Sequence, residues 1–418
     1  MSDLGVLAAV LLGYSLVSAR LERANVSAPM LFVGAGIILG PDIAGLTELE
    51  LTSETGLLLA EVALVVVLFA DASRIDLRTL QENRALPARL LGVGMPLTIG
   101  LGTAAAVLLL SDIEFWEAAM IAAILAPTDA ALGQAVVSSK RVPQRIRQAL
   151  NVESGLNDGL SIPFLFLFTG LAVAEVSASG WLAFASEQIG IGALVGGASG
   201  FAGAWLVDHA TRKEWMTATF QQLSILAIAL VAWALAGELG GNGFIAAFTA
   251  GLAASRVTES CATSILNFNQ DTGELLNLSV FFIFGAAAIG FLEGAGWEIY
   301  AFGLLSLTVV RMLPVAIALA GSGLRVSSVA FLAWFGPRGL ASIILALVVL
   351  DEEPELPAIP TLFAAMTVTV LASVFAHGIS ARPLSRVYAR RVADSHPEAA
   401  EMQSVMEMLV RGGTSQSG

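Results

Sequence analysis

Two adjacent apolar segments carry the runs Ala126-Pro127-Thr128-Asp129 and Asn151-Val152-Glu153-Ser154-Gly155-Leu156-Asn157-Asp158-Gly159. A carboxylate in the middle of a bilayer costs roughly 2.5–3.5 kcal/mol on insertion scales, so its first interpretation is functional. Asp129 follows a proline that interrupts its helix, and Asp158 lies beside an asparagine on the next helix. A broken helix beside a buried carboxylate is how transporters build a cation site near the bilayer midplane.

The composition is that of a polytopic membrane protein, with 56% hydrophobic residues, 13% charged residues and a mean hydropathy of +0.80. A spanning helix needs about 20 mostly apolar residues. We therefore expect an all-α fold with about 13 transmembrane segments. These lie near residues 4–19, 26–40, 54–70, 86–110, 114–137, 149–174, 181–207, 216–237, 243–255, 263–291, 297–320, 326–349 and 361–381, followed by a polar tail at 392–418.

The basic residues indicate the orientation. Of the 21 Lys and Arg residues, all but Arg311 and Arg338 fall in or beside the odd-numbered loops or in the tail. This separation is a positive-inside signal, and it predicts a multi-pass protein of the cell membrane with its N-terminus outside and its C-terminus in the cytoplasm. The net charge of −13 comes from acidic even-numbered loops, which are either solvated surface or mouths that concentrate cations.

The chain also shows signs of an inverted internal repeat. Segment five is interrupted at Ala126-Pro127-Thr128, and segment twelve is interrupted at Phe335-Gly336-Pro337-Arg338-Gly339. These are the fifth members of two six-helix halves related by an offset of seven segments, which reverses orientation. Interrupted segments at corresponding positions point to a transporter's binding site. Two such helices crossing would need Asp129, with Arg338 as a second candidate, to balance the charges of their broken ends.

Segment six supplies the polar chemistry. Glu153 and Asn157 are four residues apart, as are Ser154 and Asp158, so each pair shares a helix face. Together with the Thr128 hydroxyl they form a set of hard oxygens that suits Na⁺, Li⁺ or K⁺. We expect Asp158 to carry the ion, because a buried carboxylate can be neutralised by a proton or by a cation, but not comfortably by both. That competition is sufficient for exchange.

The remaining charged residues at membrane depth suggest structural roles. We expect a buried ion pair between Glu153 and Arg338, while Arg311 has no obvious partner and is a candidate to satisfy helix ends at the crossing. Asp71 is equally consistent with a helix-end residue and with a position on the route by which cations reach the site. The three histidines, His209, His377 and His396, are expected at cytoplasmic helix ends as solvated surface.

These residues carry a family resemblance. The runs 126–129, 153–159 and 336–339 resemble the signatures of monovalent cation:proton antiporters of the NhaP type, relatives of animal sodium/proton exchangers, over residues 1 to about 390. The resemblance implies a homodimer whose dimerisation helices lie in 1–85 and 216–292, with mobile core helices in 86–174 and 293–391 and a connecting helix in 175–215.

Carried over by position, the resemblance brings Asp129, Thr128, Ser154 and Asp158 to the transported cation, which is the one metal ion expected, with Asn157 supporting Asp129. It implies a Glu153–Arg338 ion pair and Asp71 on the access route. The residues themselves, apart from the resemblance, predict that Pro127, Pro337 and Arg311 support the crossing. The Asn157-Asp158 pair resembles the branch that exchanges one cation for one proton electroneutrally. Ala130, where many relatives have proline, and Asp71, where many have glutamate, leave the choice of ion open.

The sequence thus predicts Na⁺/H⁺ or Li⁺/H⁺ exchange by a secondary transporter and not an enzyme, with K⁺/H⁺ exchange on the same scaffold as the nearest alternative. A solute symporter and a channel are weaker alternatives, and an intramembrane hydrolase would need a histidine at depth beside Ser154 or Ser161. We find no Gly-rich phosphate loop of the Walker type in the sequence, which argues against a primary pump. We expect no cofactor, nucleotide or nucleic-acid partner, and a lipid bilayer around the protein.

Overall fold

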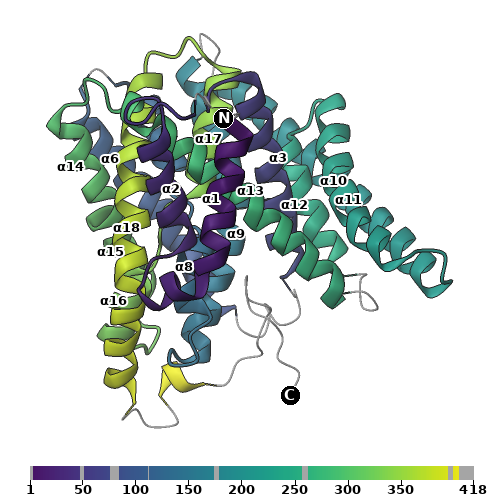
Figure 1. Ribbon diagram of the computed structural model, residues 1–418. Helices are drawn as coiled ribbons and strands as arrows, with labels where there is room; N and C mark the ends of the chain where they lie inside the picture. The colour runs from purple at the N-terminus through teal and green to yellow at the C-terminus, as the bar shows by residue number, and fades with distance from the viewer. Residues whose placement is uncertain are drawn as a thin grey trace.

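The computed structural model describes residues 3–47, 51–75, 84–111, 113–173, 178–256, 262–393 and 399–403, and all regular structure within these ranges is helical (Figure 1). Nine of the described helices, counting adjoining pieces as one, are long and apolar enough to cross a membrane. Three shorter apolar helices of 10–17 residues accompany them. The expectation of an all-α polytopic membrane protein is therefore confirmed.

The first half of the chain contains α1 (Asp3–Arg23), α2 (Ala28–Leu39), α3 (Glu54–Ser73), α5 (Ala85–Arg89), the π-helix η1 (Leu90–Gly94), α6 (Met95–Leu109), α7 (Phe115–Ile124), α8 (Ala130–Val137), α9 (Gln144–Val173) and α10 (Ala178–Arg212). The second half contains α11 (Ala218–Glu238), α12 (Gly243–Ala254), α13 (Ala262–Phe291), α14 (Trp297–Leu307), α15 (Val309–Ala318), α16 (Val326–Trp334), α17 (Leu340–Glu352), α18 (Ile359–Val392) and the 3₁₀ turn η2 (Ala400–Met402).

The helices form one bundle, and the helices in its middle are more buried than those at its edge. Every residue of α17 from Leu340 to Val349 is buried, whereas Val6 is the one buried residue of α1. A helix that is apolar and buried all round belongs to the middle of a bundle, so α17 is a core helix and α1 is peripheral. Figure 1 shows α10 and α11 on one side of the bundle and α6, α14 and α15 on the other.

Glycines allow the closest helix contacts. A side chain at Gly36 on α2 would overlap the backbone of α13 at Phe282, and one at Gly285 on α13 would overlap the backbone of α2 at Val33. The two helices therefore approach backbone to backbone, as small residues permit in membrane proteins. The helices α7, α9 and α17 pack against one another in the interior, where the broken segments meet.

Candidate functional site

The first break lies between α7 and α8. The helix ends at Ile124 and the next begins at Ala130, with Pro127 between them lacking an N–H group. Asp129 is the N-cap of α8, where its Oδ1 accepts hydrogen bonds from the N–H groups of Ala131 at 2.7 Å and Leu132 at 3.3 Å. A carboxylate at a helix N-terminus meets both the unsatisfied amides and the positive end of the helix dipole.

The second break lies between α16, which ends at Trp334, and α17, which begins at Leu340. The other carboxylate oxygen of Asp129, Oδ2, accepts from the Leu340 N–H at 2.9 Å, and the Asp129 N–H donates to the Pro337 carbonyl at 2.7 Å. One carboxylate thus caps the N-terminal ends of two helices that are more than 200 positions apart in the chain. Gly339 makes this possible, because a Cβ there would overlap the Asp129 carboxylate.

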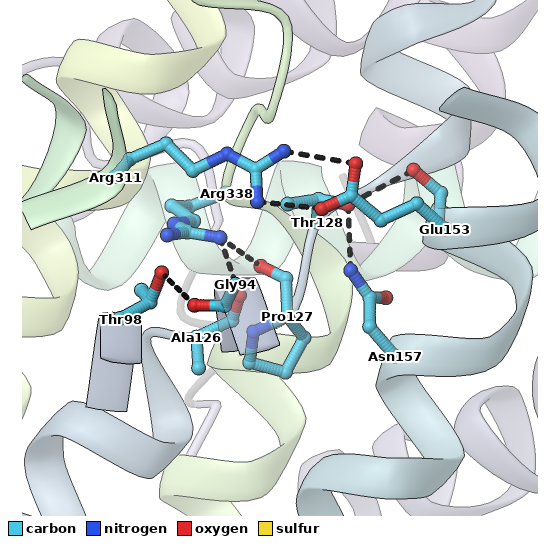
Figure 2. A network of polar contacts seen from close by, with 10 residues as sticks. Gly94, Thr98, Ala126, Pro127, Thr128, Glu153, Asn157, Arg311 and Arg338 are labelled. Atoms are coloured by element: carbon cyan, nitrogen blue, oxygen red, sulfur yellow. Dashed lines mark hydrogen bonds and ion pairs between the residues drawn. The ribbon is translucent and has the colours of Figure 1, made fainter. Parts of the chain in front are cut away.

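The carbonyl ends of α7 receive the complementary donors. Arg338 is fully buried, and its Nη1 donates to the carbonyls of Ala126 and of Pro127, the latter at 2.9 Å (Figure 2). The Ser342 hydroxyl donates to the Ile124 carbonyl at 2.8 Å. Broken helices leave such carbonyls without helical partners. The second break therefore supplies the donors that the first break needs.

The expected pairing of Glu153 with Arg338 is wrong. Glu153 on α9 instead forms a bidentate ion pair with Arg311 on α15, at 2.6 Å from Nη1 to Oε1 and 2.9 Å from Nη2 to Oε2 (Figure 2). The physical reason is that the Ala126 and Pro127 carbonyls already bind the Arg338 guanidinium. Gly336 leaves room for Arg311, since a side chain at this position would overlap the guanidinium. The two arginines have exchanged the roles that the sequence predicted.

Three of the polar residues predicted for the cation site, Thr128 at the first break and Ser154 and Asn157 on α9, contact one another. The hydroxyls of Thr128 and Ser154 are 3.0 Å apart, and Asn157 Nδ2 donates to the Thr128 hydroxyl oxygen at 2.7 Å (Figure 2). Asn157 therefore supports Thr128 and not Asp129, whose carboxylate is bound by backbone amides. Asp158 follows Asn157 and is buried, four residues after Ser154.

Asp71 lies on α3 near its end and is 9% exposed, with Oδ1 at 3.5 Å from Nη1 of Arg74. A Cβ built on Gly155 of α9 would be 4.0 Å from the Asp71 carbonyl oxygen, so this part of α3 lies against the helix that carries Ser154 and Asp158. The structure therefore places the Asp71 backbone against α9 at Gly155 and buries the Asp71 side chain in the protein interior.

The histidine expectations hold for one residue and fail for another. His209 is exposed at the end of α10, and His396 lies outside the described residues. His377 is 1% exposed and lies within α18, with Nε2 at 2.9 Å from the Trp334 carbonyl oxygen, so its interpretation as solvated surface is wrong. Sequence reasoning missed His377, Ser342 and Ser373, and the one available signal was that each is a polar residue in an apolar segment.

The arrangement offers hydroxyl, carboxylate and carbonyl oxygens, which are ligands for hard cations. Within the described residues, no three or more His, Cys, Asp or Glu side chains are grouped so as to hold a metal ion. A site with few formal charges and several neutral oxygens is consistent with a transported monovalent ion.

The chain is similar in sequence to known antiporters. The K(+)/H(+) antiporter NhaP of Alkalimonas amylolytica is 26% identical over 397 residues, which is 92% of this chain and 66% of the relative. A probable Na(+)/H(+) antiporter of Schizosaccharomyces pombe is 25% identical over 82% of this chain and 50% of its own. The chain thus spans just under two thirds of the first relative and half of the second.

The fold has a solved counterpart. The structure of the sodium proton antiporter MjNhaP1 from Methanocaldococcus jannaschii at pH 8 superposes with a TM-score of 0.78 at 21% identity, covering 93% of this chain and 98% of that one. The family profile described as sodium/hydrogen exchanger, transmembrane, matches residues 6–387. This match extends over nearly the whole chain and confirms the resemblance seen in the sequence, so the chain belongs to the sodium/hydrogen exchanger family.

Proposed function

We propose that this chain is a secondary-active antiporter that exchanges a monovalent cation for a proton at Asp158. The observation that carries the proposal is the contact of the Thr128 and Ser154 hydroxyls at 3.0 Å, where the first break meets the α9 face that bears Asp158. Family membership supports the reaction class. The cation ligands would be the Asp158 carboxylate and the two hydroxyls, with Asp129 close behind Thr128 and Asn157 holding the Thr128 side chain.

The exchange would follow from charge competition at one carboxylate. Glu153 is bound to Arg311, and Asp129 to the amides of two helix ends, so both have structural tasks. Asp158 is buried, and a buried carboxylate favours any ligand that neutralises it. A proton and a cation would displace each other there, and the neutral site would cross between the two sides by alternating access. One charge per site makes a one-to-one, electroneutral exchange the simplest stoichiometry.

Na⁺ or Li⁺ is the proposed cation, and K⁺ is the alternative. The relative from Alkalimonas amylolytica is named a K(+)/H(+) antiporter, while the archaeal structure is of a sodium proton antiporter. Selectivity among these ions depends on ångström-scale geometry of the ligand cage.

We further propose the two-part organisation that the resemblance implies. Residues 86–174 and 293–391 would form the mobile core, 1–85 and 216–292 the dimerisation helices, and 175–215 the connection, in the plasma or inner membrane with the N-terminus outside. The joint capping of two helices by Asp129 supports a rigid core in which the interrupted segments of two inverted repeats cross. The place of Asp71 beside Gly155 supports a cation route past α3.

The test is transport by purified protein in proteoliposomes with an imposed pH gradient and a pH-sensitive dye inside. Na⁺, Li⁺ and K⁺ are titrated against the wild type and Asp158→Asn, with and without valinomycin at clamped K⁺. We expect dequenching by Na⁺ or Li⁺ that is insensitive to voltage and lost in Asp158→Asn. A response to K⁺ alone would keep the mechanism and change the substrate.

The matched control is Asp208→Asn, which removes another buried aspartate, on α10, whose carboxylate is 2.8 Å from Arg212. It should retain transport. Exchange that persists in Asp158→Asn, or no response to any cation by folded wild-type protein, would overturn the proposal.

A further inference from the structure

Two polar side chains of α18 form hydrogen bonds with the backbone of the second break. Ser373 and His377 are four residues apart and share one face of the helix. The Ser373 hydroxyl accepts the Arg338 N–H at 2.6 Å, and His377 Nε2 lies 2.9 Å from the Trp334 carbonyl oxygen. Both are fully or almost fully buried. They therefore bind the backbone on both sides of Pro337, at the last residue of α16 and just before α17.

The partners of the His377 ring indicate what each of its nitrogens can do. A carbonyl oxygen only accepts, so Nε2 carries a hydrogen in any state that keeps the bond to Trp334. Nδ1 lies 3.2 Å from the Ser373 hydroxyl oxygen and 2.9 Å from the Ser373 carbonyl oxygen. Nδ1 is thus within hydrogen-bond distance of both Ser373 oxygens: it accepts from the hydroxyl when it is unprotonated and donates to the carbonyl when it is protonated. The hydroxyl also accepts from the Arg338 N–H. The result is one continuous chain from the Arg338 amide through Ser373 and His377 to Trp334.

This chain leads to the candidate cation site. The Arg338 backbone is fixed by Ser373, and its guanidinium binds the carbonyls of Ala126 and Pro127. The next residue is Thr128, whose hydroxyl is a proposed ligand. A displacement of the second break would therefore move the first break, to which the Arg338 side chain binds directly. A displacement of about 1 Å at a functional centre can greatly lower the rate of the process that takes place there.

We propose that His377 is a positioning residue for the exchange at Asp158, acting through Ser373 and Arg338 on the place of Thr128. This inference rests on the proposed function for its effect on transport. The arrangement itself is testable without transport, because it requires a protected amide at Arg338. The task of His377 is to donate a hydrogen bond to the Trp334 carbonyl while its other nitrogen contacts Ser373; it does not bind the cation.

The experiment compares His377→Leu, His377→Gln and Ser373→Ala with the wild type. Glutamine keeps an N–H donor for the Trp334 carbonyl, whereas leucine keeps only the bulk. We expect His377→Leu and Ser373→Ala to raise the apparent KM for the cation about five- to tenfold, the size expected when a positioning hydrogen bond is lost. His377→Gln should stay within about twofold of wild type, since it retains the donor.

The control is Ser380→Ala, on the same helix. Its hydroxyl accepts from the Trp334 indole N–H at 3.0 Å but touches neither backbone group of the chain described above. It should leave KM unchanged. A merely structural role of His377 would lower the amount of folded protein in all variants alike and leave KM constant, and that result would overturn the inference.

Hydrogen exchange separates this inference from the proposed function. The Arg338 amide should exchange about tenfold faster in Ser373→Ala and His377→Leu than in the wild type, because local opening limits exchange of a buried amide. If wild-type protein does not exchange cations for protons but the Arg338 amide exchanges faster in the variants, the proposed function is wrong and the hydrogen-bond arrangement is right. If hydrogen exchange at the Arg338 amide and the KM for the cation are both unchanged in the variants, the role of His377 is wrong and the proposed function is unaffected. Ser373→Ala carries the test if His377→Leu does not fold.

Discussion

The break between α7 and α8 carries Thr128 and Asp129, whereas the break between α16 and α17 carries Arg338 between Gly336 and Gly339. The first presents a hydroxyl to the α9 face and a carboxylate to two helix N-termini. In the second break, Gly336 and Gly339 leave room for the side chains of Arg311 and Asp129. Its arginine, Arg338, donates to the backbone carbonyls of the first break. The first break therefore bears the candidate ligand, and the second positions the first.

The carbonyl ends of the two breaks are also satisfied differently. Arg338 and Ser342 serve α7, and both come from the second break or the helix after it. The Trp334 carbonyl at the end of α16 is served by His377 from α18. The donors that serve the first break thus come from the second break and α17, whereas the donor that serves the second break comes from α18. This comparison leads to four predictions, which we order by expected size.

The largest effect is expected for Arg311→Met. It removes the side chain that occupies the space above Gly336, and it leaves the Glu153 carboxylate buried without its counter-ion. Breaking a buried ion pair from one side costs about 3–5 kcal/mol. Thermal unfolding in detergent should show this loss. The double variant Arg311→Met with Glu153→Gln should recover part of it, because no buried charge is stranded; equal instability of single and double variants would contradict the ion-pair explanation.

Gly339→Ala should be the next most damaging change. The new Cβ would lie 2.8 Å from the Cγ of Asp129 and closer still to its Oδ2, so the carboxylate that caps both helices must move. We expect a loss of about 3 kcal/mol, because inserted atoms in a packed interior cost about 1–3 kcal/mol and a cap is weakened as well. The matched control is Gly133→Ala on α8, where the nearest atom would be 4.0 Å away. Similar stability of the two variants would show that the second break is not closely packed.

Asp129→Asn also tests the capping of both helices, with a smaller expected loss of stability than Gly339→Ala. The amide oxygen can still accept from the Ala131 and Leu132 N–H groups, but the NH₂ group would face the N–H of Leu340. One unsatisfied buried donor costs about 1–3 kcal/mol. Hydrogen exchange should then accelerate at Leu340 and stay slow at Ala131. Equal acceleration at both amides would show that Asp129 does not divide its two oxygens between the helices.

The sequence was a good guide to where the segments break and a poor guide to which side chains meet. Proline, with its missing N–H, marks both interruptions, and the helix period places Ser154 and Asp158 on one face. The pairing of Glu153 with Arg311 depends on how α15 is rotated against α9, which apolar periodicity does not determine. His377 was misplaced because the apolar run ends near residue 381, while α18 continues to Val392. The helix therefore extends beyond the apolar run, and His377 lies in the helix interior.

The smallest effect concerns the starts of the two broken segments. The N-terminus of α7 is capped locally, where Glu117 accepts the N–H of Glu114 at 2.9 Å. The N-terminus of α16 is capped from a distance by Glu401 of η2, which accepts the N–H of Arg325 at 2.7 Å and the hydroxyl of Ser328 at 2.8 Å. The segment that carries the second break is thus attached to the chain after α18.

This attachment should depend on pH with a definite sign. Burial alone would raise the pKa of the Glu401 carboxyl, but the hydrogen bonds from Arg325 and Ser328, with the Arg325 charge, hold the pKa below its ordinary value. A lowered pKa in the docked state means that docking is fully stabilised above the ordinary glutamate pKa of about 4.3 and is lost as the pH falls through the docked value.

Glu401→Gln should therefore undock η2 at neutral pH, at a cost of about 1 kcal/mol, the usual loss for a helix cap. Hydrogen exchange at the Arg325 amide measures it. Wild-type protection should hold at neutral pH and decline only below about pH 4, where the carboxyl gains a proton. Glu117→Gln is the matched control, since it alters only the local cap of α7 and should leave the Arg325 amide protected. Full protection of that amide in Glu401→Gln would mean that the second segment, like the first, needs no distant cap.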